Sequence, residues 1–482
     1  MKLKLFIITL PVVLVFISSC TDFDSLNIDP VRLDKANPGN FINPVLYEVS
    51  SFNWRRYNDF TFALMQGKVS TNNTNGLGWY YVTDGAGDGS WTTYYRWLNN
   101  INLIEQTAIE LNEPNYQAIA IVLRSYIYQL LTDAFGNVPM SEACKGSEKV
   151  FTPKFDYQKA IYHQILSDLQ EANELFNVAS SGAGAGLRYN QDGEFLYGAG
   201  PASTSSALAI GKWKKFCNSI RLRALMRVID VAEFNAVQEI RTMLSNPNTY
   251  PVFENNAEAA FLPISGVAPQ EAPMPRVQDF SSYLVYSEFF VNTLQSWNDP
   301  RLPRFANRVS GEFVGLPSGY ATLPPISASS LNTGICVAPL KVCLMGYAEI
   351  EFIKAELALR GLIEVDAGEA YKKGVTAAIQ QWDATLPDGY FDNELTAYDG
   401  TMERVQSQKF FALFFCDYQQ WFEYNRTGLP VLPRGAGVPA GNQMPQRFKY
   451  PVSLQRTNLK NYQDARTAMG GDDFSVKLFW QK

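Results

Sequence analysis

Three consecutive aromatic residues, Trp79, Tyr80 and Tyr81, lie in a polar, glycine-rich stretch that also carries Asn75 and Asp84. Aromatic rings offer apolar faces on which sugar rings stack, while amides and carboxylates bond to hydroxyl groups. Successive side chains of a strand point to opposite faces, so a regular element cannot bury all three rings. We expect this segment to contribute to a ligand-binding surface; the alternative is that the rings plug the loop against its scaffold.

Other tryptophans are weaker candidates for the same stacking chemistry. Trp54 and Trp297 lie outside the aromatic triplet. If Trp79 is a packing residue, we expect the ligand-binding surface near these two tryptophans. Trp97, Trp213 and Trp382 fall within helical patterns and are expected in the core.

The sequence contains no clear set of catalytic residues. His163 is the only histidine and falls on the polar side of its predicted helix, so neither a triad nor a multi-histidine metal site is expected. Glu349 and Glu356 share one helical face, but such carboxylates usually pair with Lys or Arg. The Gly/Ala run over 182–186 follows no strand and indicates a flexible loop. The sequence therefore predicts a binding protein that is not an enzyme.

The acidic and cysteine residues indicate neither a metal nor a cofactor. Asp84 with Asp88, and Asp472 with Asp473, lack the regular spacing of a calcium loop. Five cysteines follow Cys20, with no C-x-x-C pair, so neither a zinc knuckle nor a dense disulfide framework is indicated. Two of these five, Cys336 and Cys343, are close enough in sequence to bridge a short loop, but sequence does not fix the required geometry.

The amino end has the pattern of a lipoprotein signal. Lys2 and Lys4 precede an uncharged run over 5–17, which is shorter than the roughly 20 apolar residues of a membrane-spanning helix. This pattern predicts a removed signal peptide over 1–19. The residues before Cys20 resemble a bacterial lipobox, which makes Cys20 the lipid-bearing first residue of a tether over 20–38, ahead of a single helical domain over 39–482.

Composition indicates a compact protein with a large core. The chain has 482 residues, of which 46% are hydrophobic and 18% charged, and its formal net charge is -6. No basic cluster is present, which argues against nucleic acid as a partner and favours neutral ligands.

Apolar residues at intervals of three and four predict helices that come in pairs. The predicted helices cover 119–134, 161–176, 213–229, 347–360, 367–382 and 405–415. The fold class is therefore mainly α, with tetratricopeptide-like helix pairs forming a right-handed superhelical scaffold. Three stretches, 72–90, 180–212 and 262–340, are rich in Gly, Pro, Ser or Asn and are predicted to be long irregular loops that carry the ligand surface.

Several blocks resemble the SusD/RagB family of Bacteroidetes nutrient-binding lipoproteins, over nearly the whole mature chain. The blocks are 131–139 (LTDAFGNVP), 213–223 (WKKFCNSIRLR), 347–356 (YAEIEFIKAE), 370–374 (AYKKG), 408–410 (QKF), 421–430 (WFEYNRTGLP) and 470–473 (GGDD). Cys217 and Phe410 stand where Ala and Trp are expected, which bears only on local packing.

The resemblance implies a function that the periodicity alone does not. It implies a lipid-anchored outer-membrane protein, facing the cell exterior, that delivers oligosaccharide to a partner TonB-dependent (SusC-like) transporter. A peptide-binding lid of the RagB type, or a helical adaptor that contacts only proteins, are the alternatives. Asp22, Asp24 and Asp29 also resemble the surface-export signal of such lipoproteins.

Overall fold

The computed structural model describes residues 37–72, 74–176, 187, 194–197, 204–276, 279–280 and 283–481. The chain divides into two units, 1–37 and 38–482, and the described elements belong to the second. The expected signal peptide and Cys20 lie outside the described residues.

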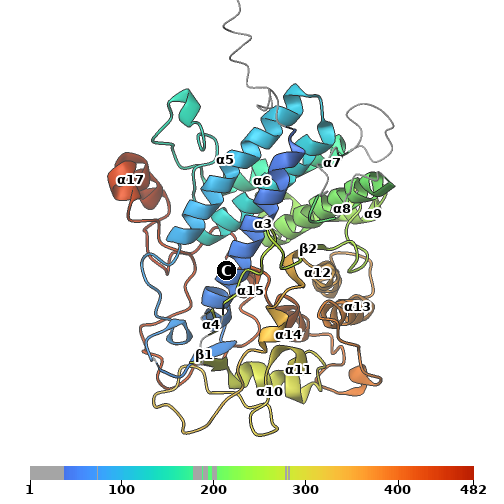
Figure 1. Ribbon diagram of the computed structural model, residues 1–482, viewed down its shortest axis with the longest axis vertical. Coiled ribbons are helices and arrows are strands. Elements are labelled where there is room, and N and C mark those ends of the chain that lie inside the picture. The colour runs from blue at the N-terminus through green and yellow to red at the C-terminus, as the bar shows by residue number, and fades with distance from the viewer. Residues whose placement is uncertain are drawn as a thin grey trace, which may run out of the picture. The chain divides into compact units, whose positions relative to one another are not determined.

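The first half of the second unit is a layer of long helices (Figure 1). These helices are α3 (Gly39–Arg56), α5 (Asp88–Glu110), α6 (Pro114–Phe135), α7 (Gln158–Leu175), α8 (Thr204–Arg227) and α9 (Ala236–Ser245). From α5 to α8 each helix packs against the next one in the chain. The mainly α fold is thereby confirmed, while the tetratricopeptide-like, right-handed superhelix stays a prediction.

Helix α6 forms the middle of this layer. Pro114 occupies its first turn, where a missing N–H costs nothing, and Gly136 ends it at a φ of +88°. Among the described helices it alone is long and apolar enough to cross a membrane, but 94% of that apolar stretch is buried inside the protein. Its hydrophobicity therefore belongs to the core.

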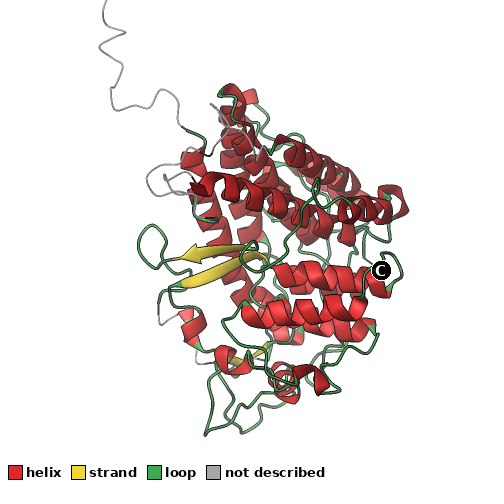
Figure 2. Ribbon diagram, turned by 90° about the vertical axis from the view of Figure 1, so that its right-hand side faces the viewer, coloured by secondary structure: helices red, strands yellow, loops and turns green. Residues whose placement is uncertain are grey.

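Shorter helices, turns and two small sheets make up the second half of the unit and the connections within the first half (Figure 2). The α-helices are α4 (Phe62–Leu64), α10 (Glu288–Ser296), α11 (Leu302–Phe305), α12 (Tyr347–Leu359), α13 (Ala367–Gln380), α14 (Met402–Ala412), α15 (Gln419–Thr427), α16 (Leu454–Thr457) and α17 (Leu459–Ala468). A π-helical turn, η1 (Tyr57–Thr61), continues α3, and short 3-10 turns are η2 (Leu77–Trp79), η3 (Gly146–Glu148), η4 (Ala232–Phe234), η6 (Thr333–Ile335) and η7 (Tyr390–Asp392). Strand β1 (Lys68–Ser70) pairs with β3 (Leu284–Tyr286), and β2 (Ala260–Ile264) pairs with β4 (Leu340–Met345), both antiparallel.

Two of the predicted irregular stretches are more ordered than expected. The stretch 262–340 contains α10 and α11 with the whole of β3, and α8 begins at Thr204, inside the predicted loop over 180–212. The strand partners lie far apart in sequence, so local patterns do not reveal them. The start of α10 did have a local sequence signal, because serine is a preferred N-cap residue. The Ser287 hydroxyl fills this role by accepting a bond from the Phe290 amide.

The described cysteines are all free thiols, so Cys336 and Cys343 are not bridged. Cys343 Sγ lies 3.5 Å from Cys416 Sγ instead. Cys217 and Cys416 are buried, as their apolar helical surroundings predict.

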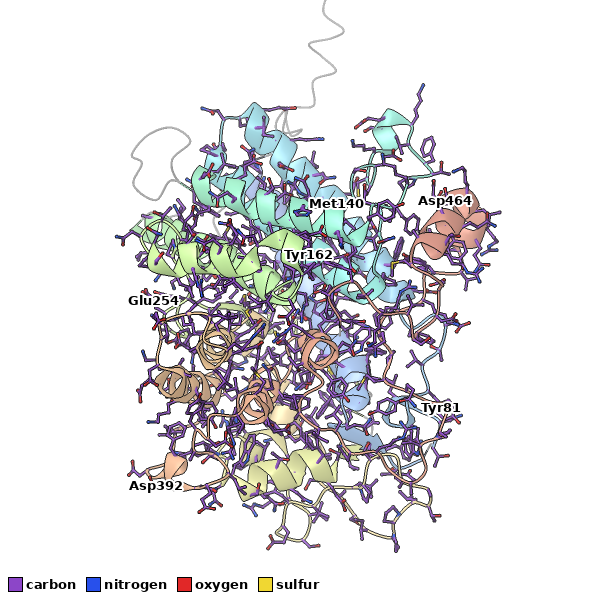
Figure 3. The ribbon with its side chains drawn as sticks, turned by 180° about the vertical axis from the view of Figure 1, so that it is seen from behind. Tyr81, Met140, Tyr162, Glu254, Asp392 and Asp464 are labelled. Atoms are coloured by element: carbon purple, nitrogen blue, oxygen red, sulfur yellow. The ribbon has the colours of Figure 1, made fainter. Side chains whose placement is uncertain are left out.

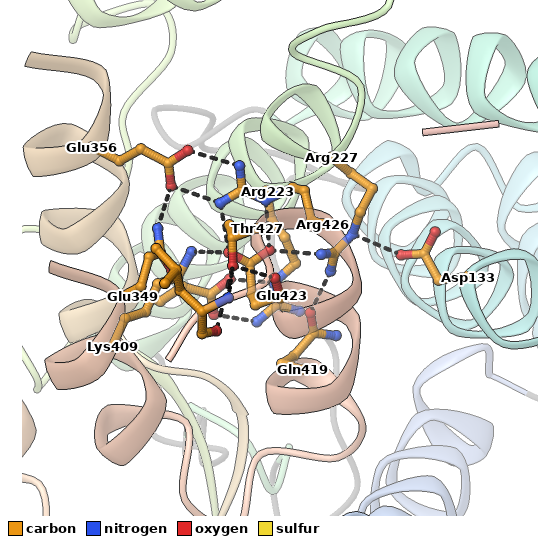
Figure 4. A network of polar contacts seen from close by, with 12 residues as sticks. Asp133, Arg223, Arg227, Glu349, Glu356, Lys409, Gln419, Glu423, Arg426 and Thr427 are labelled. Carbon is orange, nitrogen blue, oxygen red and sulfur yellow. Dashed lines mark hydrogen bonds and ion pairs between the residues drawn. The ribbon is translucent and has the colours of Figure 1, made fainter. Parts of the chain in front are cut away.

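A buried carboxylate, Glu423 on α15, joins the two halves of the helical unit (Figure 4). It accepts bonds from Arg227 of α8 at 2.6 Å, Lys409 of α14 at 2.6 Å and Arg426 at 2.8 Å. Arg227 also bonds to Asp133 of α6 at 3.1 Å. Burial alone raises the pKa of Glu423, but the three cations outweigh it and hold that pKa well below its usual value.

Two further ion pairs extend this network to α12. Arg426 holds Glu356 with two bonds of 2.7 and 2.6 Å, and Arg223 holds Glu349 with bonds of 2.7 and 2.5 Å. Planar guanidinium–carboxylate pairs of this kind fix geometry as well as charge. Both glutamates are therefore structural ion-pair partners, as the common role of such carboxylates predicts.

We expect Glu423→Gln to lower the free energy of unfolding by about 3–5 kcal/mol, because it leaves buried cations without their shared counter-charge. Equilibrium unfolding in urea measures this loss. Glu254→Gln is the matched control, since the Glu254 side chain is 68% exposed and pairs with Lys215 at the surface; its effect should stay below about 1 kcal/mol. Equal effects of the two substitutions would contradict the central role of Glu423.

Candidate functional site

Trp79, the first ring of the aromatic triplet, is inside the protein. Its side chain is 1% exposed, and Nε1 donates to the carbonyl oxygen of Tyr320 at 2.9 Å. The Trp79 and Tyr320 rings meet edge-on with centroids 4.8 Å apart, in a small core that also includes Val69 and Leu316. This placement corrects the expectation that Trp79 offers an exposed stacking face.

The other members of this segment lie at or near the surface. Tyr80 takes a left-handed conformation, with a φ of +57°, which turns the chain, and its half-buried hydroxyl has a pKa raised by burial to about 12. Tyr81 is 43% exposed and lies at the edge of the molecule (Figure 3). Asp84 is exposed and forms an ion pair with Lys449 at 3.0 Å, and Asn75 is exposed as well. The segment therefore presents one exposed ring instead of three.

Trp54 and Trp297, the weaker candidates, are also buried. Trp54 is 1% exposed and stacks on Phe415 with ring centroids 4.1 Å apart. Trp297 is 6% exposed and packs edge-on against Phe411 at 5.1 Å. Trp297 thus offers little surface to a ligand, but Trp54 borders a cavity.

This cavity has a volume of about 680 Å³. It lies beside the β2–β4 sheet and the ends of α11 and α13. Four aromatic rings form part of its wall, those of Trp54, Phe261, Trp382 and Phe415. Ligand pockets generally combine such apolar walls with a few polar groups, in volumes of about 300–1,000 Å³.

Polar and charged side chains complete the lining. Arg304 donates to the Trp382 carbonyl oxygen at 3.2 Å and lies 4.0 Å from the Asp383 carboxylate. Lys341 is exposed, and the amides of Gln270, Asn332 and Gln381 also line the cavity. Rings with amides and charges around them suit a ligand that has both apolar faces and hydroxyl groups.

The predicted site residues do not converge in one place. Of those named from the sequence as ligand-binding, only Trp54 lines the cavity. Trp382 was expected in the core, yet it is only partly buried and contributes to the cavity wall. The sequence held one signal for it, since the polar residues Gln380, Gln381 and Asp383 flank it at the end of α13. Phe261 carried no signal, because its position depends on the long-range pairing of β2 with β4.

The candidates for catalysis have other roles. His163 is more than half exposed, stacks on Phe234 at 4.3 Å and lies 3.3 Å from Glu233. The described residues contain no group of three His, Cys, Asp or Glu side chains able to hold a metal ion.

A mainly helical scaffold with an aromatic-walled cavity fits the class of ligand-binding proteins. Residues 30–451 match the model of the SusD-like family described as "Starch-binding associating with outer membrane", and the chain belongs to this family. A comparison with curated proteins finds no match.

Several solved structures share the fold. A chitin-binding protein is 24% identical, with a TM-score of 0.77, over 92% of this chain and 100% of its own. A SusD homologue from Bacteroides fragilis is 23% identical, with a TM-score of 0.77, over 93% and 100% of the two chains. A SusD-like protein from Bacteroides thetaiotaomicron is 21% identical, with a TM-score of 0.73, over 92% and 98%.

We expect Trp79→Ala to reduce the free energy of unfolding by about 3–5 kcal/mol, the usual range for removing a buried large aromatic ring. Urea unfolding of the substituted protein measures this cost. Tyr81→Ala, at the exposed ring two residues further on, should change stability by less than about 0.5 kcal/mol. A stable Trp79→Ala protein would show that the indole does not hold the segment in place.

Proposed function

We propose that this protein is a lipid-anchored outer-membrane protein that binds oligosaccharide at the cell surface and delivers it to a partner TonB-dependent (SusC-like) transporter. Membership of the SusD-like family supports the surface and binding roles. Binding without turnover is part of the proposal, because Glu349 and Glu356 are each held by an arginine, and His163 is exposed beside Glu233 and does not line the aromatic-walled cavity.

The observation that carries the proposal is the cavity walled by Trp54, Trp382 and Phe415. Its volume of about 680 Å³ lies within the range of about 300–1,000 Å³ that is usual for small-ligand pockets. Trp382 is the most accessible indole of the wall, and Arg304, Asp383 and the lining amides supply bonds to hydroxyl groups. We place the main ligand contacts here.

The segment around Tyr81 is a second proposed contact surface. Tyr81 offers a stacking ring, with Tyr80 partly buried beside it, and Asn75 and Asp84 offer polar groups. The segment contributes no residue to the cavity lining. A ligand that used both surfaces would therefore have to be a long glycan.

A peptide ligand is the second candidate function. The cavity's apolar wall with Lys341 and Asp383 at its edge also suits a short peptide with aromatic side chains. An adaptor that contacts only proteins would leave the cavity without a role.

We expect Trp382→Ala to weaken oligosaccharide binding more than tenfold, because loss of a central stacking ring costs about 2 kcal/mol or more. Calorimetry with maltohexaose, chitohexaose and an aromatic tripeptide measures affinity for each ligand class. Trp382→Phe keeps a ring and should restore part of the affinity. Tyr157→Ala, at a 67% exposed ring outside both surfaces, is the control.

Tyr81→Ala separates the two proposed surfaces in the same experiment. A loss confined to Tyr81→Ala would move the site to the 72–90 segment and contradict the cavity proposal. Tight binding of the tripeptide alone would favour the peptide candidate, and no binding of any probe would favour the adaptor.

We expect the mature protein to begin at Cys20 and to carry lipid there, on the basis of the residues that precede it. Mass spectrometry of the amino-terminal peptide from the native host checks this. The control is Cys20→Ser, which should abolish membrane association and release the chain in the soluble fraction. Recovery of unmodified Cys20 from the wild-type protein would contradict the anchor.

A further inference from the structure

Lys68 on β1 is a buried cation without a counter-ion among the described residues. Lys68 is only 6% exposed. Its Nζ makes one hydrogen bond, to the Asn58 amide oxygen at 3.0 Å. The Phe62 ring lies 5.7 Å from Nζ. No described carboxylate lies within ion-pair distance of it, whereas the buried arginines of the Glu423 network are all paired.

The surroundings of Lys68 compensate its charge only indirectly. The nearest acidic residue is reached through Asn58, whose Nδ2 donates to the Asp59 carboxylate at 2.9 Å, and Asp59 is exposed to solvent. Burial lowers the pKa of Lys68 to about 8, with Asp59 and the Cys336 thiol acting in the opposite direction. An ammonium ion in such a place costs several kcal/mol of stability unless it gains a partner. We therefore expect the buried ammonium group of Lys68 to serve a function other than stability.

Lys68 faces a cavity of about 220 Å³, separate from the larger one. At about 30 Å³ per water this is roughly seven waters, enough for a carboxylate with a few attached atoms. The remaining lining is mostly uncharged and includes Asn58, Phe62, Tyr286, Asn307, Ser330 and Thr333. Asp279, the one carboxylate in the described lining, is already held by Arg276 at 2.7 Å.

The two cavities lie on either side of one short segment. Asn332, Gly334 and Ile335 line the larger cavity, whereas Leu331 and Thr333 line the smaller one. A ligand in the larger cavity, which Trp382 and Trp54 line, therefore lies across this segment from the cavity that Lys68 lines.

We propose that the small cavity receives a carboxylate group of the ligand, with the Lys68 ammonium as its counter-ion. This inference rests on the proposed function and sharpens it, since it predicts an acidic oligosaccharide that carries a uronic acid residue. The carboxyl terminus of a peptide has the same chemistry, so the test includes both sources. The Ser330 hydroxyl, which accepts a bond from the Asn307 amide at 3.1 Å, and the Thr333 hydroxyl are the additional donors in the lining.

The test measures binding of glucuronate, glucose and N-acetylalanine to the purified full-length protein by calorimetry or ligand-observed NMR. Glucuronate should bind at least tenfold more tightly than glucose, which has the same ring without the carboxylate. Lys68→Met keeps the length of the side chain and removes its charge, so glucuronate binding should fall at least tenfold. Lys460→Met, at a lysine that is 86% exposed on α17 and lines neither cavity, is the matched control and should retain glucuronate binding.

Stability provides the second measurement. Lys68→Met should leave the melting temperature unchanged or raise it, because the substitution removes an uncompensated buried charge. Unchanged glucuronate affinity in Lys68→Met, or equal affinities for glucuronate and glucose in the wild type, would overturn the proposal. Binding of N-acetylalanine but not glucuronate, lost in Lys68→Met, would support the carboxylate site with a peptide as its source.

Failure of this inference is distinguishable from failure of the proposed function. Neutral hexaose binding that persists in both the wild type and Lys68→Met, with no glucuronate binding, would overturn the acid site alone. Absence of neutral and acidic sugar binding together would contradict the oligosaccharide function as well.

Discussion

The buried charge of Glu423 is the constraint on which the arrangement of the helices depends. Its carboxylate receives Arg227 from α8, Lys409 from α14 and Arg426 from its own helix, and Arg227 also reaches Asp133 on α6. A hydrophobic contact tolerates a small shift of one helix along another, but a buried ion without its partner is costly. The network therefore allows few relative positions of the two halves of the helical unit.

This constraint reaches the cavity through the turn between α14 and α15. Lys409 and Glu423 lie on the two helices, and the turn between them carries Phe415, which stacks on Trp54 in the cavity wall. Phe415 and Asp417 have positive φ values, +58° and +36°, which are unfavourable for residues other than glycine. The buried Asp417 carboxylate stabilises the turn by accepting bonds from the Tyr126 hydroxyl at 2.9 Å and from the turn's own amides. The ion network and this turn together hold the aromatic wall in place.

The sequence was informative wherever structure is local and uninformative wherever it is not. Periodicity located α6, α7, α12 and α13 closely, since a helix buries a face that its own spacing defines. The aromatic triplet was predicted to be a stacking surface, with packing against the scaffold as the alternative, and only the distant Tyr320 shows that Trp79 packs inside while Tyr81 is exposed. The cavity could not be predicted, because β2 and β4 form it by pairing across about 80 residues of chain. Nothing in the sequence indicated the role of Lys68, because an exposed lysine and a buried lysine without a counter-ion cannot be told apart from the sequence.

The two cavities also suggest how selectivity is divided over the site. An aromatic wall with amides discriminates weakly among sugars, because every pyranose has an apolar face and several hydroxyl groups. A buried charge discriminates strongly, because a ligand without the complementary group must either leave the charge unpaired or leave the space filled with water. If the same ligand occupies both spaces, the larger cavity supplies general affinity and Lys68 supplies the choice between neutral and acidic ligands. The lower stability that a buried Lys68 charge gives the unliganded protein is then a consequence of its role in selecting acidic ligands.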